Sequence, residues 1–178
     1  MQEIRTIETN RYILKLLEKK YINEIFNILS NPDVIQNLNM SIHLNIDDTN
    51  KLINEYYDGL KNNEKFPFEI IDKKTNEFIG VFLIKLDIYD EDSFEFTIYL
   101  NPSHWGNGVY TEILPFMTEF AFLDIGTKHF RGFVMEKNIA SRIVLEKTDF
   151  ILEKVFNVDG IEDKIYSYIK TNNYIKKL

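Results

Sequence analysis

The chain has 178 residues, of which 44% are hydrophobic and 14% aromatic. This composition excludes a disordered protein, and the length fits one domain, residues 1–178, with a sizeable core. The absence of cysteine excludes a disulfide framework, a catalytic thiolate and a cysteine-bound zinc ion. A net charge of −7 disfavours nonspecific nucleic-acid binding, and no stretch approaches the roughly 20 apolar residues that cross a bilayer. We therefore expect a protein without nucleic-acid or membrane partners.

The first residues of the chain are polar and charged where a signal peptide needs an apolar run, so cytoplasmic residence is expected.

The N-terminal half of the chain predicts a strand followed by two helices. Arg11–Leu17 predicts a strand, and Lys19–Leu29 predicts a helix that ends at Asn31-Pro32. Asp47 is expected to cap the second helix. The apolar positions of that helix recur at helical spacing: Leu52, Ile53, Tyr56, Tyr57 and Leu60.

From Phe66 onward the pattern changes to strands that alternate with helices. Phe66–Ile71 and Phe78–Tyr89 predict a hairpin with a long second arm, and Ser93–Leu100 predicts the next strand. A helix is expected from the end of the following loop to about Leu123. The remaining elements are a strand, a helix and two strands, at Phe130–Met135, Ile139–Lys147, Phe150–Phe156 and Lys164–Ile169. This order predicts an α/β (α+β) protein with a mixed sheet and helices on both faces.

The loop Trp105-Gly106-Asn107-Gly108 lies between a predicted strand and a predicted helix. Glycines allow the backbone to approach a ligand closely, and the first N–H groups of a helix favour an anion such as a pyrophosphate. A tight turn without a ligand is the alternative interpretation. The residues after Gly108, Val109-Tyr110-Thr111, exclude both a P-loop and the GxGxxG motif of a dinucleotide-binding fold.

Motifs along nearly the whole chain have the order and spacing of one known family. They are Glu8–Leu14, Ser30–Val34, Phe78–Gly80, Glu95–Leu100, Trp105–Glu112 and Asn138–Lys147. With these motifs the chain resembles the GCN5-related N-acetyltransferase (GNAT) superfamily, in the branch that includes the bacterial ribosomal-protein N-terminal acetyltransferases. The resemblance implies a GNAT fold, with a mostly antiparallel sheet of about six or seven strands and a splayed central strand pair.

By this resemblance, the chain uses acetyl-CoA as cosubstrate, without a metal, to acetylate a primary amine. The amine would belong to a protein N-terminus, a polyamine, an aminoglycoside or an amino acid. The pantetheine arm would enter between the strands Glu95–Leu100 and Phe130–Met135, and the amides of Trp105–Thr111 would hold the pyrophosphate. The implied cofactor-binding residues are Tyr99, Leu100, Trp105, Gly106, Asn107, Gly108, Val109, Tyr110, Thr111, Asn138 and Ser141.

Four positions depart from the family pattern. Tyr110 replaces a glycine or alanine that lets the backbone pass close to the cofactor, and Thr97 replaces a common glycine. Asp149 stands where a glycine usually forms a left-handed helix cap, a conformation that Asp tolerates. Leu145 occupies the position of the tyrosine that many members use as general acid, and leucine has no proton to donate.

Glu95 and Ser141 are the candidate catalytic residues. Glu95 would act as general base, directly or through a water, because partial burial between Phe94 and Phe96 would bring its pKa toward the working range. Its alternative is an outward-facing carboxylate without function. In the branch resembled here, Ser141 is the usual donor of a proton to the thiolate; its alternative is a plain helix-start hydroxyl. For Asn138 the alternative is an N-cap, a role compatible with cofactor binding.

Other candidates have structural interpretations. Glu112 is expected to stabilise the helix dipole, Pro115 to bend its helix, and Trp105 to anchor the loop by packing. Tyr56 and Tyr57 are assigned to the core rather than to an acceptor cleft. The three histidines lack metal-ligand spacing: His43, His104 and His129.

Two rival functions stay open at this point. The first is an acyl-CoA-binding regulator that has kept the fold without turnover, which Tyr110 and Leu145 favour. The second is an unrelated binding module that has a helix-capped anion loop. The sequence leaves open the acceptor, the acyl chain length and the choice between monomer and homodimer. An acceptor cleft would be shaped by the loops Leu38–Asp47 and Ile88–Ser93.

Overall fold

The computed structural model describes residues 4–38, 40–88 and 90–173. These residues form two compact units, and the strand β5 (Ser93–Leu100) contributes to both. The first unit consists of Met1–Lys85 with Ile98–Val109, and the second of Leu86–Thr97 with Tyr110–Leu178. No helix in the described part of the chain is long and apolar enough to cross a membrane.

The first unit contains a series of antiparallel strands that precedes β5 in the chain. The earlier strands are β1 (Ile7–Glu8), β2 (Tyr12–Leu16), β3 (Lys65–Asp72) and β4 (Phe78–Leu86). Two-residue β1, which pairs with β2, was not predicted. β4 is shorter than the predicted arm to Tyr89, because the chain turns at Asp87, whose N–H donates to the Ser93 carbonyl at 3.0 Å. Tyr89 itself lies outside the described residues.

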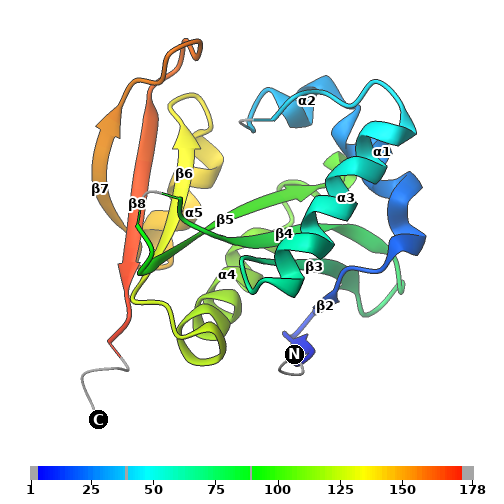
Figure 1. Ribbon diagram of the computed structural model, residues 1–178, viewed down its shortest axis with the longest axis horizontal. Coiled ribbons are helices and arrows are strands. Elements are labelled where there is room, and N and C mark those ends of the chain that lie inside the picture. The colour runs from blue at the N-terminus through cyan, green and yellow to red at the C-terminus, as the bar shows by residue number, and fades with distance from the viewer. Residues whose placement is uncertain (1–3, 39, 89, 174–178) are drawn as a thin grey trace. The chain divides into compact units, whose positions relative to one another are not determined.

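In the described part of the first unit, three α-helices precede β3, and Figure 1 labels them. They are α1 (Ile22–Leu29), α2 (Pro32–Ile35) and α3 (Ile46–Lys61). Residues 19–21, which were predicted to begin α1, form a 3-10 turn instead. The prediction that Asp47 caps α3 was wrong: Asn45 is the cap, and its side-chain oxygen accepts the N–H groups of Asp47 and Asp48. Asp48 completes a capping box by accepting the Asn45 N–H.

The core of the first unit lies between these helices and the strands β3, β4 and β5. Its members are buried apolar side chains that include Ile25 and Leu29 of α1, Ile53 of α3 and Val81 of β4. Tyr56 is buried among them, so its assignment to the core is confirmed. Figure 1 shows α3 lying over β3.

Glu69 of β3 is a fully buried carboxylate in this unit. One of its oxygens accepts the Glu18 N–H at 2.8 Å, while the other lies 3.4 Å from the Lys15 ammonium. Burial is the largest influence on this group and raises the pKa of Glu69 above its ordinary value. The folded state is therefore penalised for holding a negative charge at this position.

The Glu69→Gln variant is expected to be more stable than the natural protein at neutral pH, and by a margin that depends on pH. Below the ordinary carboxyl pKa of 4.5 both folded and unfolded Glu69 are protonated, so no penalty applies. As pH rises above 4.5, Glu69 loses its proton in the unfolded chain before it does so in the folded protein. The loss of folding stability therefore grows until the pH exceeds the raised pKa of Glu69 in the folded protein. Urea unfolding from pH 4 to pH 8 measures the difference. Exposed Glu55 is the control position, where Glu→Gln should give no such pH trend.

The second unit contains the remaining helices and strands. They are α4 (Val109–Phe120, of which all but Val109 belong to this unit), a wider turn η3 (Ala121–Ile125), β6 (His129–Met135), α5 (Ile139–Lys147), β7 (Ile151–Phe156) and β8 (Ile165–Thr171). The predicted end of the long helix near Leu123 falls inside η3, which stops at Gly126 with a φ of +84°. Pro115 lies inside α4, as expected. Figure 1 shows α5 behind β6 and β8.

The strands of the two units have the hydrogen-bonded order β1-β2-β3-β4-β5-β6-β8-β7. The sheet is mixed, since β5 and β6 are parallel while β6, β8 and β7 are antiparallel to their neighbours. The described residues therefore form eight strands, where six or seven were expected. In the second unit Phe96, Phe130 and Phe150 form an aromatic core. Asp149 has a φ of +63°, which confirms the predicted left-handed cap after α5.

Candidate active site

The loop between β5 and α4 is built by local hydrogen bonds in the first unit. The Asn101 side-chain oxygen accepts the N–H of Ser103, and the Trp105 N–H donates to the Pro102 carbonyl at 3.1 Å. Trp105 was predicted to pack beneath the loop, but its side chain is 43% exposed. Its indole N–H instead donates to the Leu100 carbonyl at 3.2 Å, so the side chain connects the loop to the end of β5.

The two glycines of the loop have backbone conformations that favour glycine. Gly106 has a φ of +74° and Gly108 a φ of +71°, and a Cβ on Gly106 would meet no atom within 4 Å. The chain then enters α4 at Val109, whose first-turn N–H groups cannot be satisfied within the helix. Arg11 lies beside the loop, where Nη1 donates to the Asn107 carbonyl at 2.9 Å. The loop thus has backbone donors and open space, which suit an anion.

The end of β5 that leads into this loop lies close to β4. A Cβ on Gly80 of β4 would clash with the Tyr99 carbonyl oxygen and would lie 2.9 Å from the Leu100 Cα. Tyr99 is buried, with its hydroxyl 3.5 Å from that of Tyr56, and burial raises the pKa of Tyr99. The glycine in the motif Phe78-Ile79-Gly80 therefore permits the close approach of two backbones.

The Gly80→Ala variant is expected to lose about 1–3 kcal/mol of the free energy of unfolding. The added methyl group meets main-chain atoms of Tyr99 and Leu100, which cannot rotate away as a side chain would. Denaturant unfolding measures the loss. An unchanged unfolding midpoint would show that the two strands can separate without cost.

The first turn of α4 contains the residue that departs most from the family pattern. The Tyr110 ring packs edge-on against Phe96 of β5, with ring centroids 6.4 Å apart, and burial raises the pKa of Tyr110. Thr111 is exposed. Glu112 lies in the first turn of α4, where its negative charge interacts favourably with the helix dipole, as predicted.

Glu95 lies half-buried in the parallel ladder between β5 and β6. This ladder runs over four residue pairs, from Ser93 with His129 to Phe96 with Gly132, and it pairs Glu95 with Arg131. Thr97–Leu100 of β5 lie beyond the last of these pairs. Paired residues of neighbouring strands point to the same face, so Glu95 shares a face with a cation.

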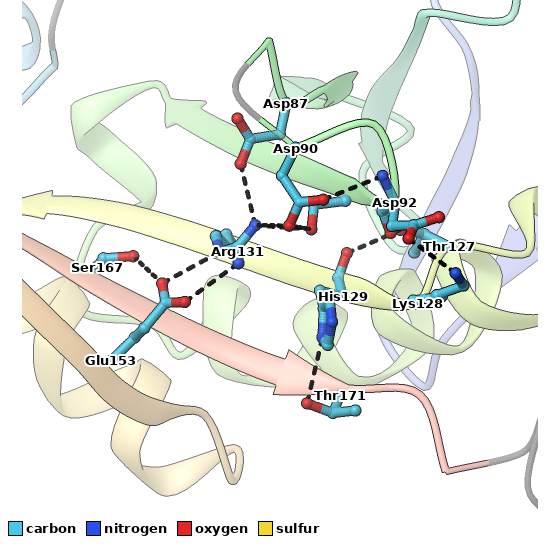
Figure 2. A network of polar contacts seen from close by, with 11 residues as sticks. Asp87, Asp90, Asp92, Thr127, Lys128, His129, Arg131, Glu153, Ser167 and Thr171 are labelled. Atoms are coloured by element: carbon cyan, nitrogen blue, oxygen red, sulfur yellow. Dashed lines mark hydrogen bonds and ion pairs between the residues drawn. The ribbon is translucent and has the colours of Figure 1, made fainter.

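Arg131 is the centre of a polar network that was not predicted (Figure 2). Its Nη1 contacts Asp87 at 3.1 Å and Asp90 at 2.9 Å, in the turn before β5. On the other side its Nε and Nη2 bind both carboxylate oxygens of Glu153 in β7, each at 3.1 Å. The one available signal was a cation between apolar residues of a predicted strand. The network fastens the turn before β5 to β6 and β7.

Asn138 and Ser141 lie at the start of α5 in the second unit. The Asn138 side-chain oxygen accepts the Ser141 N–H at 3.2 Å, which confirms the N-cap interpretation. Ser141 is half-buried. Leu145 is fully buried, and its methyl groups would lie 3.3 Å from a Cβ on Gly132. Leucine at this position therefore packs against β6 and supplies no proton.

Two further features bear on the site. In the first unit a hollow of about 410 Å³ opens between Met40–Leu44 and one face of α3. The residues that line it include much of the loop that was expected to shape an acceptor cleft.

Among the described residues, no three His, Asp or Glu side chains are grouped in a way that could hold a metal ion. His43 contacts Thr49, and His104 lies 3.6 Å from Glu77.

A profile of the acetyltransferase (GNAT) domain matches residues 11–151, which is most of the chain and includes the loop, α4 and α5. The chain belongs to the GNAT acetyltransferase family. Its sequence is 28% identical over 116 residues to the probable N-acetyltransferase YjcK of Bacillus subtilis. That match covers 62% of this chain and 64% of YjcK, so the chain spans less than two thirds of that relative.

Solved structures of other acetyltransferases have the same fold. The ribosomal-protein-S5-alanine acetyltransferase of Vibrio fischeri has a TM-score of 0.81 and 15% identity, covering 96% of this chain and 98% of that one. The spermidine N-acetyltransferase of Vibrio cholerae, in complex with CoA and spermine, has a TM-score of 0.79 and 19% identity, covering 91% and 96%. The expected GNAT fold is thereby confirmed.

Proposed function

We propose that this GNAT protein transfers an acetyl group from acetyl-CoA to a primary amine, on a protein N-terminus or a small molecule. The observation that carries the proposal is the loop before α4, in which Gly106 and Gly108 both have positive φ. Relatives support it, since the structure of the Vibrio cholerae spermidine N-acetyltransferase contains CoA.

The residues at the loop fit the diphosphate of CoA. Space is open above Gly106, and the backbone donors at the start of α4 suit two linked phosphates. Residues 105–111 would bind the diphosphate, the main chain of Tyr99 and Leu100 would bind the pantetheine arm, and Asn138 and Ser141 would lie at the thioester.

Acetyl-CoA supplies an acetyl group that is activated as a thioester. Glu95 would accept the proton of the attacking amine, and Ser141 would donate a proton to the departing sulfur as the C–N bond forms and the C–S bond breaks. The chain has no cysteine to carry the acetyl group, which supports direct transfer. Because Leu145 has no proton to donate, Ser141 is the proposed proton donor.

Two classes of acceptor are consistent with the relatives. A lysine-like amine with a pKa of about 10.4 is neutral in about one molecule in 2,500 at pH 7, whereas an α-amine with a pKa of about 7.7–8.0 is neutral in roughly one in ten. A site with a single candidate base therefore favours an α-amine. The chain's net charge of −7 is also compatible with a cationic polyamine such as the substrate named for the Vibrio cholerae enzyme.

The proposal is tested by release of CoA thiol from acetyl-CoA in the presence of peptides with free N-termini, spermidine and an aminoglycoside. Turnover with at least one acceptor is expected. CoA binding without turnover on any acceptor would favour the rival function of an acyl-CoA-binding regulator, for which Tyr110 and the buried Leu145 are the supporting features. Absence of a thermal shift with either acetyl-CoA or CoA would refute both.

A further inference from the structure

Arg11 joins the start of the chain to the glycine loop. Its Nη1 donates to the Asn107 carbonyl at 2.9 Å, across a separation of 96 residues. Its Nη2 lies 3.5 Å from the position that a Cβ on Gly108 would occupy. The Arg11 guanidinium also lies 5.0 Å from the centre of the Tyr12 ring. The main-chain carbonyl of Arg11 accepts the Lys73 N–H at 2.9 Å. Main-chain and ring contacts thus hold the guanidinium at the loop.

The hydrogen bond to Asn107 determines the direction of the next N–H group. The described part of the chain has no cis peptide bond, so the carbonyl of Asn107 and the N–H of Gly108 point in opposite directions. Because the carbonyl points to Arg11, the Gly108 N–H points away from it. A cationic donor on the carbonyl also polarises the peptide, which strengthens the N–H as a donor.

The glycines on either side make this peptide easy to rotate. Gly106 and Gly108 have φ values of +74° and +71°, and glycine adopts positive and negative φ with similar ease. The loop's own backbone therefore places little restriction on the orientation of the peptide between Asn107 and Gly108. A fixed orientation requires a contact from outside the loop, and Arg11 supplies one.

We propose that Arg11 is a positioning residue that holds the Asn107–Gly108 peptide with the Gly108 N–H directed at a phosphate of CoA. This inference rests on the proposed function, because it assigns that N–H a phosphate to bind. The role of Arg11 is to orient a main-chain donor, and its positive charge is secondary. A residue at the beginning of the chain thereby sets the cofactor affinity of a loop near its middle.

The binding test compares Arg11→Gln with Lys73→Gln by calorimetry. Lys73 is a matched control, since its ammonium binds Glu8 and the Thr9 carbonyl. Arg11→Gln is expected to raise the Kd for CoA by at least about 10-fold, and Lys73→Gln by less than about two-fold. In turnover assays the KM for acetyl-CoA should rise, while kcat and the KM for the amine stay unchanged. A Kd for Arg11→Gln within two-fold of the natural value, or equal losses in both variants, would overturn the inference.

A second measurement does not depend on cofactor binding. In amide NMR spectra of the protein without ligand, Arg11→Gln should broaden or double the Gly108 signal, because the peptide then samples two orientations. Lys73→Gln should leave that signal single. A single, sharp Gly108 signal in Arg11→Gln would contradict the positioning role. If the natural protein binds no CoA, the proposed function fails, while the NMR comparison still decides whether Arg11 orders the peptide.

Discussion

Replacement of Arg131 by methionine is expected to lower the free energy of unfolding by about 3–5 kcal/mol. The Arg131 and Asp87 side chains are 13% and 6% exposed, so the variant would remove the guanidinium from beside a carboxylate in a poorly hydrated place. Asp90 and Glu153 lose the same partner. Methionine fills most of the space of the arginine stem, which limits the effect of lost packing. Chemical denaturation at pH 7 measures the change.

The pH dependence of stability separates this charge effect from packing. The Ser93 hydroxyl and the Arg131 guanidinium lower the pKa of Asp90 to about 2. A lowered carboxyl pKa stabilises the fold above the ordinary value of 3.8, and this contribution is lost as pH falls through about 2. The difference between natural protein and Arg131→Met should therefore shrink below about pH 4.

Lys128 provides a matched control for the loss of a positive charge. It forms an ion pair with Asp92 at 2.7 Å, but both side chains are more than half exposed. Lys128→Met should change the free energy of unfolding by only about 0–1 kcal/mol. Similar losses in Arg131→Met and Lys128→Met would show that the network contributes no more than a surface ion pair.

Local sequence signals were sufficient for most elements of the fold. β5 and α5 have the predicted bounds, because one follows from an alternating apolar pattern and the other from an N-cap at Asn138. The positive φ of Asp149 was also predictable, since a helix that ends without glycine needs one of the few residues that tolerate it. The helix α3 was predicted, but its cap was misplaced by two residues, from Asn45 to Asp47.

The polar interactions inside the units were beyond the reach of such signals. Glu69 lies in a strand whose neighbours are buried on both faces, so alternation could not reveal that its carboxylate is buried as well. Arg131 meets residues 41 and 22 positions away, and Arg11 meets Asn107 after 96. Contacts of this kind depend on strand register and on loop geometry, which a single sequence does not specify.

The type of candidate site could be predicted from the sequence, but the contacts that hold its loop in place could not. The glycines before α4 indicated an anion loop because their residue type and their place before a helix are both local. Trp105 was assigned to packing, whereas its indole N–H holds a carbonyl and its ring is exposed. An indole ring can either pack against apolar atoms or donate a hydrogen bond through its N–H, and the position of nearby backbone carbonyls determines which occurs.

Replacement of Glu95 by glutamine is expected to reduce kcat for amine acetylation by about 10²–10⁴-fold, if Glu95 is the general base. Glutamine has nearly the same shape but cannot accept a proton at neutral pH, so the Kd for CoA should stay within two-fold of the natural value. The exposed Glu91, in the turn before β5, is the control position, where Glu→Gln should leave kcat unchanged.

The Glu95 variant also separates a base from a residue that only supports the sheet. Because Glu95 is paired with Arg131 in the ladder, Glu95→Gln could weaken the strand instead of the chemistry. Raising the pH supplies more neutral amine, so a variant that lacks its base should regain activity steadily with pH, most of all with a lysine-like acceptor. A variant with damaged structure would lose unfolding stability and CoA affinity and show no such recovery. Ser141→Ala should differ from both, since a proton donor to the thiolate becomes more important as pH rises and free protons become scarce.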